Sequence, residues 1–130
     1  MTQEEKDLVI KDLCGRLPYG VKTPYIGFEM TIRGVDVESK TVDVIDWGKA
    51  RFAAVRIEKI KPYLRPMSSM TEEEKYQYEK TQWEYQAEYC APEYFDGLES
   101  YDWLNAHLFD FRGLIGKGLA LEAPEGMYNN

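Results

Sequence analysis

Apolar and polar residues alternate along residues 28–45, which read Phe28-Glu-Met-Thr-Ile-Arg-Gly-Val-Asp-Val-Glu-Ser-Lys-Thr-Val-Asp-Val-Ile45. A period of two is typical of β-strands that bury one face and expose the other. Gly34 interrupts the first run and predicts a bulge or bend. The polar residues 38–40 predict a turn into a second strand at 41–45. This stretch therefore predicts an antiparallel sheet.

The same pattern continues toward the middle of the chain. Residues 46–49 (Asp-Trp-Gly-Lys) predict another turn, and residues 51–55 predict a further short strand. Residues 57–66 predict a single helical turn and a short last strand. Short strands joined by tight turns within residues 20–66 favour a small antiparallel barrel or a strongly bent sheet. The strand number and the closing segment resemble small barrels of the Src-homology-3 type, without any ligand-binding motif.

Helical signals flank the sheet. Thr2 and Glu5 have the spacing of a capping box before a helix at 3–14, and Gly15 is the expected stop. Thr71 and Glu74 predict a second capping box before the longest helix, at 72–89. Later elements are expected to be a helix at 101–108 capped by Ser100, a helical turn begun by Asp110, an edge strand at 119–122 and a frayed tail from Pro124.

These signals predict one α+β domain over residues 1–130, with 44% hydrophobic residues to form its core. Its parts are an N-terminal helix (1–19), a small antiparallel barrel-like sheet (20–66) and an acidic, tyrosine-rich part (67–130) with a long helix and short C-terminal helices.

The charge is distributed unevenly between these parts. Residues 1–66 carry 12 Lys and Arg against 10 Asp and Glu, whereas residues 67–130 carry 4 against 13. The net charge of −7 disfavours general affinity for nucleic acids or anionic membranes, although a local basic face can override the average. Two surfaces of different chemistry are expected on one small protein.

The sequence also suggests a cellular location. No apolar run reaches the roughly 18 residues of a membrane span, and residues 1–7 are acidic and polar, unlike a secretory signal. We therefore expect a cytoplasmic protein of a cell without compartments, or of a virus that infects one. In that setting Cys14 and Cys90 are expected to be reduced.

The long helix carries two aromatic faces. Tyr78, Tyr85 and Tyr89 lie opposite the face that carries Tyr76 and Trp83. In one interpretation, C-terminal residues cover the face of Tyr78, Tyr85 and Tyr89; these residues include Leu104, Phe109, Phe111 and Leu114. The other leaves Tyr78, Tyr85 and Tyr89 as a surface for a partner protein or for self-association, because tyrosine suits interfaces.

A second candidate surface lies at the end of the sheet region. Its basic residues are Arg51, Arg56, Lys59, Lys61 and Arg65, with Phe52 and Tyr63 nearby. Basic and aromatic side chains on a small barrel can hold a phosphate backbone and stack bases. The alternative interpretation is the solvated face of a strand, with ion pairs to the acidic helix.

The pattern gives little support for catalysis. His107 is the single histidine, and catalysis would need Asp102 or Asp110 to orient it toward Cys14 or Cys90. Asp102 lies five residues earlier, which is a poor helical spacing, and neither cysteine lies in a recognisable nucleophile motif. One histidine and two distant cysteines offer no metal-ligand cluster. The glycines at 113, 116 and 118 lack the spacing of a phosphate loop. We assign no catalytic, cofactor or metal residue and expect no small-molecule site.

Three longer segments carry a further resemblance. They are Lys6-Asp-Leu-Val-Ile-Lys-Asp-Leu-Cys-Gly-Arg-Leu-Pro-Tyr-Gly-Val21, Ile60-Lys-Pro-Tyr-Leu-Arg-Pro-Met-Ser-Ser-Met-Thr-Glu-Glu73, and Tyr101-Asp-Trp-Leu-Asn-Ala-His-Leu-Phe-Asp-Phe-Arg-Gly-Leu-Ile115 with Gly118-Leu-Ala-Leu-Glu-Ala123. Together they resemble a group of small uncharacterised proteins from gut bacteria and their phages. The resemblance implies a cytoplasmic, phage-related protein and no particular activity.

The sequence thus favours a non-enzymatic interaction or adaptor protein that meets a protein partner through Tyr78, Tyr85 and Tyr89. The alternative is a nucleic-acid-binding accessory protein that uses the basic residues of the sheet region.

Overall fold

The structure is a computed structural model that describes the backbone of residues 1–89 and 98–128 and the side chains of residues 1–81 and 99–128. It confirms the α+β class. The helices are α1 (Gln3–Arg16), α2 (Glu72–Tyr89) and α3 (Leu98–Ala106), with 3₁₀ turns η1 (Leu17–Tyr19), η2 (Ile57–Lys59) and η3 (Met67–Ser69). The strands are β1 (Lys22–Tyr25), β2 (Phe28–Asp36), β3 (Thr41–Asp46), β4 (Arg51–Arg56), β5 (Tyr63–Leu64) and β6 (Leu121–Glu122).

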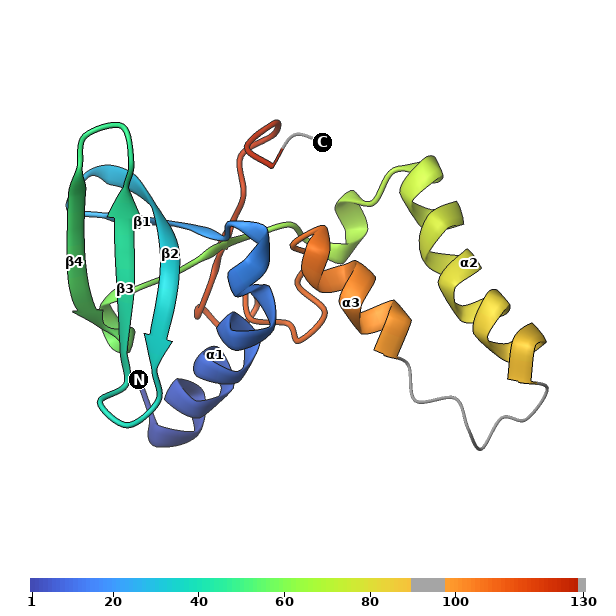
Figure 1. Cartoon of the computed structure of the whole chain (residues 1–130), viewed down its shortest axis with the longest axis horizontal. Helices are drawn as coiled ribbons and strands as arrows, with labels where there is room; N and C mark the ends of the chain where they lie inside the picture. Colours follow the sequence, from blue (N-terminus) through green and yellow to red (C-terminus); the bar gives the residue numbers. More distant parts are fainter. Residues whose placement is uncertain (90–97, 129–130) are drawn as a thin grey trace.

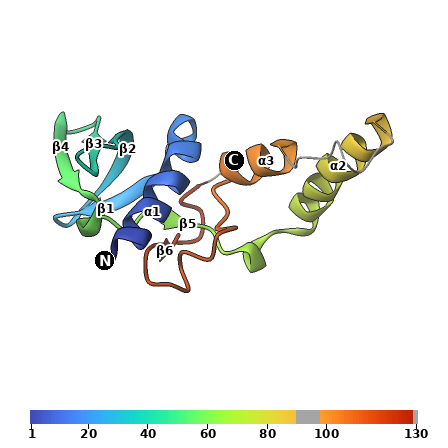
Figure 2. The same ribbon diagram turned by 90° about the horizontal axis from the view of Figure 1, so that it is seen from below.

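The molecule is elongated, with the sheet at one end and the α2–α3 pair at the other (Figure 1). Helix α1 lies between them against the sheet, and the C-terminal segment runs through the middle; Figure 2 shows the same order from below. No helix within the described residues is both long and apolar enough to span a bilayer.

Strands β1 to β4 form an antiparallel sheet in the order β1-β2-β3-β4. The predicted bulge is confirmed, because the β2–β3 register shifts between Ile32 and Gly34. The predicted small antiparallel sheet is confirmed, but it does not close into a barrel. Strand β5 pairs instead with β6 in parallel, through Tyr63 with Leu121 and Leu64 with Glu122. The C-terminal segment therefore pairs with the strand that was expected to close the barrel.

Helix α1 begins as predicted. Thr2 and Glu5 form the capping box, with bonds of 3.1 Å from Glu5 N–H to the Thr2 hydroxyl and 2.8 Å from Thr2 N–H to the Glu5 carboxylate. The predicted end is wrong, because the helix continues through Gly15 to Arg16. A Cβ at Gly15 would lie 3.1 Å from the Asn105 amide nitrogen. Gly15 thus permits the close approach of α3 and does not stop the helix.

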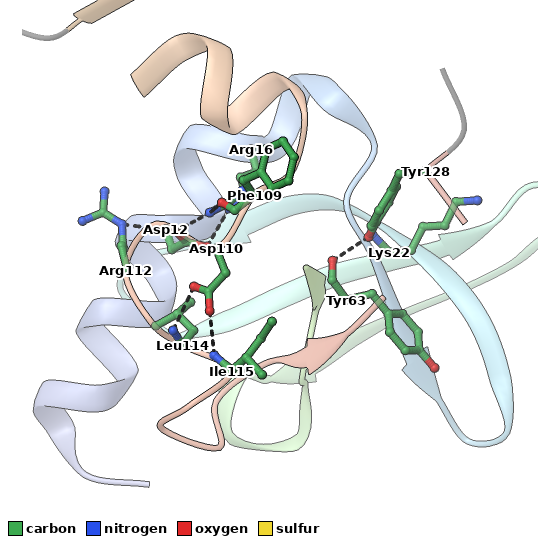
Figure 3. Close-up of polar contacts among 10 residues, drawn as sticks. All are labelled: Asp12, Arg16, Lys22, Tyr63, Phe109, Asp110, Arg112, Leu114, Ile115 and Tyr128. Carbon is green, nitrogen blue, oxygen red and sulfur yellow. Dashed lines mark hydrogen bonds and ion pairs between the residues drawn. The ribbon is translucent and has the colours of Figure 1, made fainter. Parts of the chain in front are cut away.

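The C-terminal half needs three corrections. Helix α3 begins at Leu98, so Ser100 lies within it, buried, with its hydroxyl 3.2 Å from that of Thr81. Asp110 caps the backbone N–H groups of Leu114 and Ile115, at 2.8 and 2.9 Å (Figure 3), but the residues that follow it form turns and not a helix.

The predicted frayed tail is also wrong up to residue 128. The Tyr128 hydroxyl accepts a hydrogen bond from Lys22 N–H at 2.8 Å and donates one to the Tyr63 carbonyl at 2.7 Å (Figure 3). Burial raises the pKa of this phenol well above its ordinary value of 10.0, so the hydroxyl keeps its proton. The tail is thereby tied to the start of β1.

Two apolar clusters hold these elements together. The larger one joins α1, the inner face of the sheet and the C-terminal segment; Val9, Leu13, Ile32, Val42, Ile60 and Leu114 are among its fully buried members. The smaller one joins Met70, Leu104 and Phe109, with Tyr78, Trp103 and Phe111 packed around them.

A buried ion pair lies between the two clusters. Arg16 and Asp12 on α1 form a two-pronged contact of 2.7 and 3.0 Å, and both side chains are completely buried. Arg16 also donates to the Phe109 carbonyl at 2.7 Å, and Arg112 donates to Asp12 at 3.2 Å (Figure 3). These contacts fasten the C-terminal segment to the first helix.

We expect Asp12→Asn to lower the free energy of unfolding by about 3–5 kcal/mol, because the buried Arg16 guanidinium loses its counter-charge. Urea denaturation measures this change. Asp7→Asn is the matched control, since Asp7 is exposed and its contact with Lys40 (3.1 Å) should contribute less than about 1 kcal/mol. Equal losses for the two variants would contradict the assigned role of Asp12.

Candidate interaction surface

Two hairpin turns meet at one end of the sheet, because the β1–β2 and β3–β4 connections lie on the same side of an antiparallel meander. The first turn is Ile26-Gly27, with φ angles of 49° and 77°. Positive φ at both positions matches a type I′ hairpin, which favours Asn and Gly. Ile26 is β-branched and 74% exposed, so an apolar side chain occupies a place that local conformation disfavours.

The second turn also presents an apolar side chain to solvent. Trp47 is 71% exposed in the β3–β4 turn, and Phe52 at the start of β4 is 76% exposed. Turns are normally polar, so a tryptophan at this place is unusual. Large exposed apolar groups gathered at one end of a small domain are typical of interaction sites.

A cation–π contact links the two hairpins. The Arg51 guanidinium at the start of β4 lies 3.9 Å from the ring centre of Phe28 at the start of β2. Phe28 is itself 43% exposed. Because β3 separates these strands, the Arg51 side chain reaches across the sheet to Phe28. We call Ile26, Phe28, Trp47, Arg51 and Phe52 the hairpin-end surface; it covers both faces of this end of the sheet, because the adjacent residues Arg51 and Phe52 project to opposite faces of β4.

Local sequence patterns do not predict this surface as a whole, although Arg51 and Phe52 belong to the predicted basic surface. The feature that points to it is the presence of Ile26 and Trp47 in turns, where Gly, Asn, Asp and Pro are expected. Their placement at the same end of the sheet as Phe28 and Phe52 depends on the pairing of strands, which the local pattern does not give.

Of the tyrosines predicted to meet a partner, Tyr78 is half-buried. Its ring lies 5.6 Å from that of Trp103 on α3, and it packs on the cluster of Met70, Leu104 and Phe109. At this position the helix face is covered by C-terminal residues, as in the first of the two interpretations. The side chains of Tyr85 and Tyr89, and all of Cys90, lie outside the described residues, whereas Cys14 is a free, exposed thiol.

The basic residues of the sheet region do not gather on one face. Arg51 and Arg56 occupy the two ends of β4, and five residues along a strand place their side chains on opposite faces. Lys59 and Lys61 follow β4 and are exposed. Arg65 is engaged elsewhere, in a contact with Glu74.

Arg65 forms a two-pronged contact with Glu74, at 2.8 and 2.7 Å, and stacks 4.1 Å from the centre of the Phe109 ring. Glu74 also completes the predicted second capping box with Thr71, at 3.0 and 3.1 Å. The hydrogen bonds from Arg65, and secondly those from Thr71, lower the pKa of Glu74 to about 2. Such a carboxylate is a weak base, which argues against proton abstraction by Glu74.

His107 lies beside this pair. Its ring stacks on Trp103 at 4.1 Å, and its Nδ1 is 3.9 Å from the Glu74 carboxylate. Burial lowers the pKa of His107, more than the nearby Glu74 raises it. Arg65, Glu74 and His107 line a cavity of about 750 Å³ that also has Glu122, Glu125 and Tyr128 on its wall. Within the described residues, no three His, Cys, Asp or Glu side chains are grouped to hold a metal ion.

Comparisons with known proteins add no assignment: no protein-family model, no curated protein and no solved structure matches this chain.

We expect Tyr78→Ala to lower the free energy of unfolding by about 1–3 kcal/mol, because the variant loses the packing on Trp103 and the cluster beneath it. Tyr76→Ala is the matched control on the same helix: Tyr76 is 68% exposed, and its loss should change stability by less than about 0.5 kcal/mol. Thermal unfolding followed by circular dichroism compares the two. A Tyr78 variant as stable as the Tyr76 variant would contradict the packing role.

The Arg65–Glu74 contact predicts a pH dependence of stability. The pKa of Glu74 is about 2 in the folded chain, against an ordinary value of 4.5, so ionised Glu74 stabilises the fold above about pH 4.5. This stabilisation is lost as the pH falls from about 4.5 to 2. Glu74→Gln should therefore be less stable than the wild type at pH 7. The difference between their free energies of unfolding should narrow as the pH falls from about 4.5 to 2. Glu72→Gln, at a 95% exposed side chain, is the control and should track the wild type.

Proposed function

We propose that this protein is a non-enzymatic interaction or adaptor protein that binds a protein partner through the hairpin-end surface. The observation that carries the proposal is the exposure, at one end of the sheet, of three large apolar side chains: Ile26, Trp47 and Phe52, each more than 70% exposed. Keeping such groups in water has no benefit for the isolated chain, whereas burying them against a partner is favourable.

The conformation of the surface supports the same proposal. Ile26 is held in a left-handed conformation that costs free energy for a β-branched residue. Residues kept in such conformations often serve a function, and an apolar group carried on a tight turn is well placed to enter a partner's pocket.

The chemistry of the surface resembles that of binding hot spots. Tryptophan and arginine dominate the binding energy of many protein interfaces, and aromatic side chains are enriched there. The guanidinium of Arg51 is already held on the Phe28 ring, so less conformational entropy is lost when a partner binds. The alternative function, nucleic-acid binding, would need Arg51, Arg56, Lys59 and Lys61 to act together, although Arg51 and Arg56 lie on opposite faces of β4.

Site-specific photocrosslinking tests the proposal. A photoreactive phenylalanine derivative replaces Trp47 in one protein and Tyr76, an exposed aromatic residue on the distant helix α2, in a control protein. We expect position 47 to crosslink to a defined protein in the cell that encodes this chain, and position 76 to give at most a tenth of that yield (about tenfold corresponds to 1.4 kcal/mol of binding free energy).

A further variant separates binding from folding. Phe52→Ser should lower the crosslinking yield from position 47 while leaving the melting temperature nearly unchanged, because Phe52 is exposed. Equal yields at positions 47 and 76 would contradict the proposal. Crosslinks to RNA or DNA that disappear as salt rises would replace it with the nucleic-acid alternative.

A further inference from the structure

Strand β4 forms one edge of the sheet (Figure 1). Bonded pairs in an antiparallel ladder alternate with non-bonded pairs. Ile57 N–H donates to the Lys40 carbonyl at 3.0 Å, so the bonded pairs include Val42 with Val55 and Val44 with Ala53. The N–H and C=O groups of the intervening residues Phe52, Ala54 and Arg56 therefore point away from β3.

This edge is accessible along its length. Phe52, Ala54 and Arg56 are all exposed, and no backbone hydrogen bond outside the sheet engages them within the described part of the chain. The usual devices that block an edge strand are a proline, a bulge, charged side chains or a covering segment. Strand β4 (Arg-Phe-Ala-Ala-Val-Arg) has no proline, its charged residues stand only at its two ends, and its pairing with β3 shows no register shift.

The charges of β4 indicate what it pairs with. The strand carries Arg51 and Arg56 and no carboxylate, and Glu58, Lys59 and Lys61 follow it, so residues 51–61 carry four basic groups against one acidic group. A second copy of β4 would place two such positively charged segments side by side, which disfavours self-pairing. An acidic segment would instead complement the charge.

The open backbone edge selects an extended peptide. An added strand projects side chains onto both faces of the sheet, so a carboxylate can meet Arg56 on one face, whereas the Arg51 guanidinium lies over Phe28, on the side of β4 away from the free edge. The outward N–H and C=O groups of β4 add directional hydrogen bonds that a peptide alone can match.

We propose that an acidic, extended segment of a partner protein adds to the free edge of β4 as a further strand. The inference rests on the proposed function and specifies the partner's chemistry. Backbone hydrogen bonds to Phe52, Ala54 and Arg56 supply the affinity, while a carboxylate opposite Arg56 sets the register.

The probe is a peptide selected on the full chain from a phage-displayed library of random dodecapeptides and then synthesised. Amide hydrogen exchange of the ¹⁵N-labelled protein, with and without the peptide, shows which backbone amides the peptide protects. We expect new protection at the amides of Phe52, Ala54 and Arg56, and little change at Ala53 and Val55, whose amides already pair with β3. The selected peptides should be acidic.

Two variants provide the control. Ala54→Pro removes one outward N–H donor at a position where an edge strand tolerates proline, and should weaken peptide binding by about tenfold or more. Ala54→Ser keeps the donor and should bind like the wild type. Circular dichroism and thermal unfolding verify that both variants fold. If Ala54→Pro does not fold, the pattern of amide protection in the wild type alone tests strand addition.

The outcomes are distinguishable. Peptides that bind without alternating protection, or that bind Ala54→Pro equally well, overturn strand addition and leave the proposed function standing. Selected peptides without acidic character overturn the acidic partner. Concentration-dependent dimers of the free chain that Ala54→Pro abolishes would assign the edge to a second copy and overturn the partner segment. If no peptide is enriched, the proposal of strand addition is wrong. The crosslinking experiment at position 47 tests the proposed function independently.

Discussion

The arrangement of this protein depends on one buried carboxylate. Asp12 on α1 neutralises Arg16 within the interior and receives Arg112 from the C-terminal segment. Burying a charged pair is costly, and the pair holds together because each partner would be far less stable alone. Since Arg16 also donates to the Phe109 carbonyl, the first helix and a segment almost a hundred residues later are fixed to one another.

Phe109 links α1 and the C-terminal segment to the α2–α3 pair. The residues on either side of Phe109 in the chain both pair with Arg65: Arg65 N–H donates to the Leu108 carbonyl, and Asp110 N–H donates to the Arg65 carbonyl, both at 2.8 Å. The Phe109 ring lies beneath Arg65 and stacks on Trp103. Arg65 in turn holds Glu74 at the start of α2. A chain of polar contacts therefore runs from α1 through Phe109 to the far end of the molecule.

The main sheet stays open. Strand β5 pairs with β6, and among the described residues β4 pairs with β3 alone, at the opposite end of the molecule from α2 and α3. The exposed apolar turns and the basic edge strand lie together there, whereas residues 67–130 carry 4 Lys and Arg against 13 Asp and Glu. The sheet end thus offers aromatic and cationic groups and an open strand edge, while the C-terminal half is strongly acidic. This separation supports the interaction role that we propose for the sheet end.

Local sequence determined the elements whose signals are local. Alternation placed β2, β3 and β4, Gly34 marked the bulge, and both capping boxes fixed the starts of α1 and α2, because these features depend on residues within a few positions of each other. Only the tertiary structure decided the features that join distant residues: the passage of α1 through Gly15 beside Asn105, the capture of β5 by β6, the burial of Tyr78 under α3, and the engagement of Arg65 by Glu74. The hairpin-end surface belongs to the same group. Its residues are individually visible in the sequence, but their meeting depends on strand order and on an open edge, which arise from packing between segments far apart along the chain.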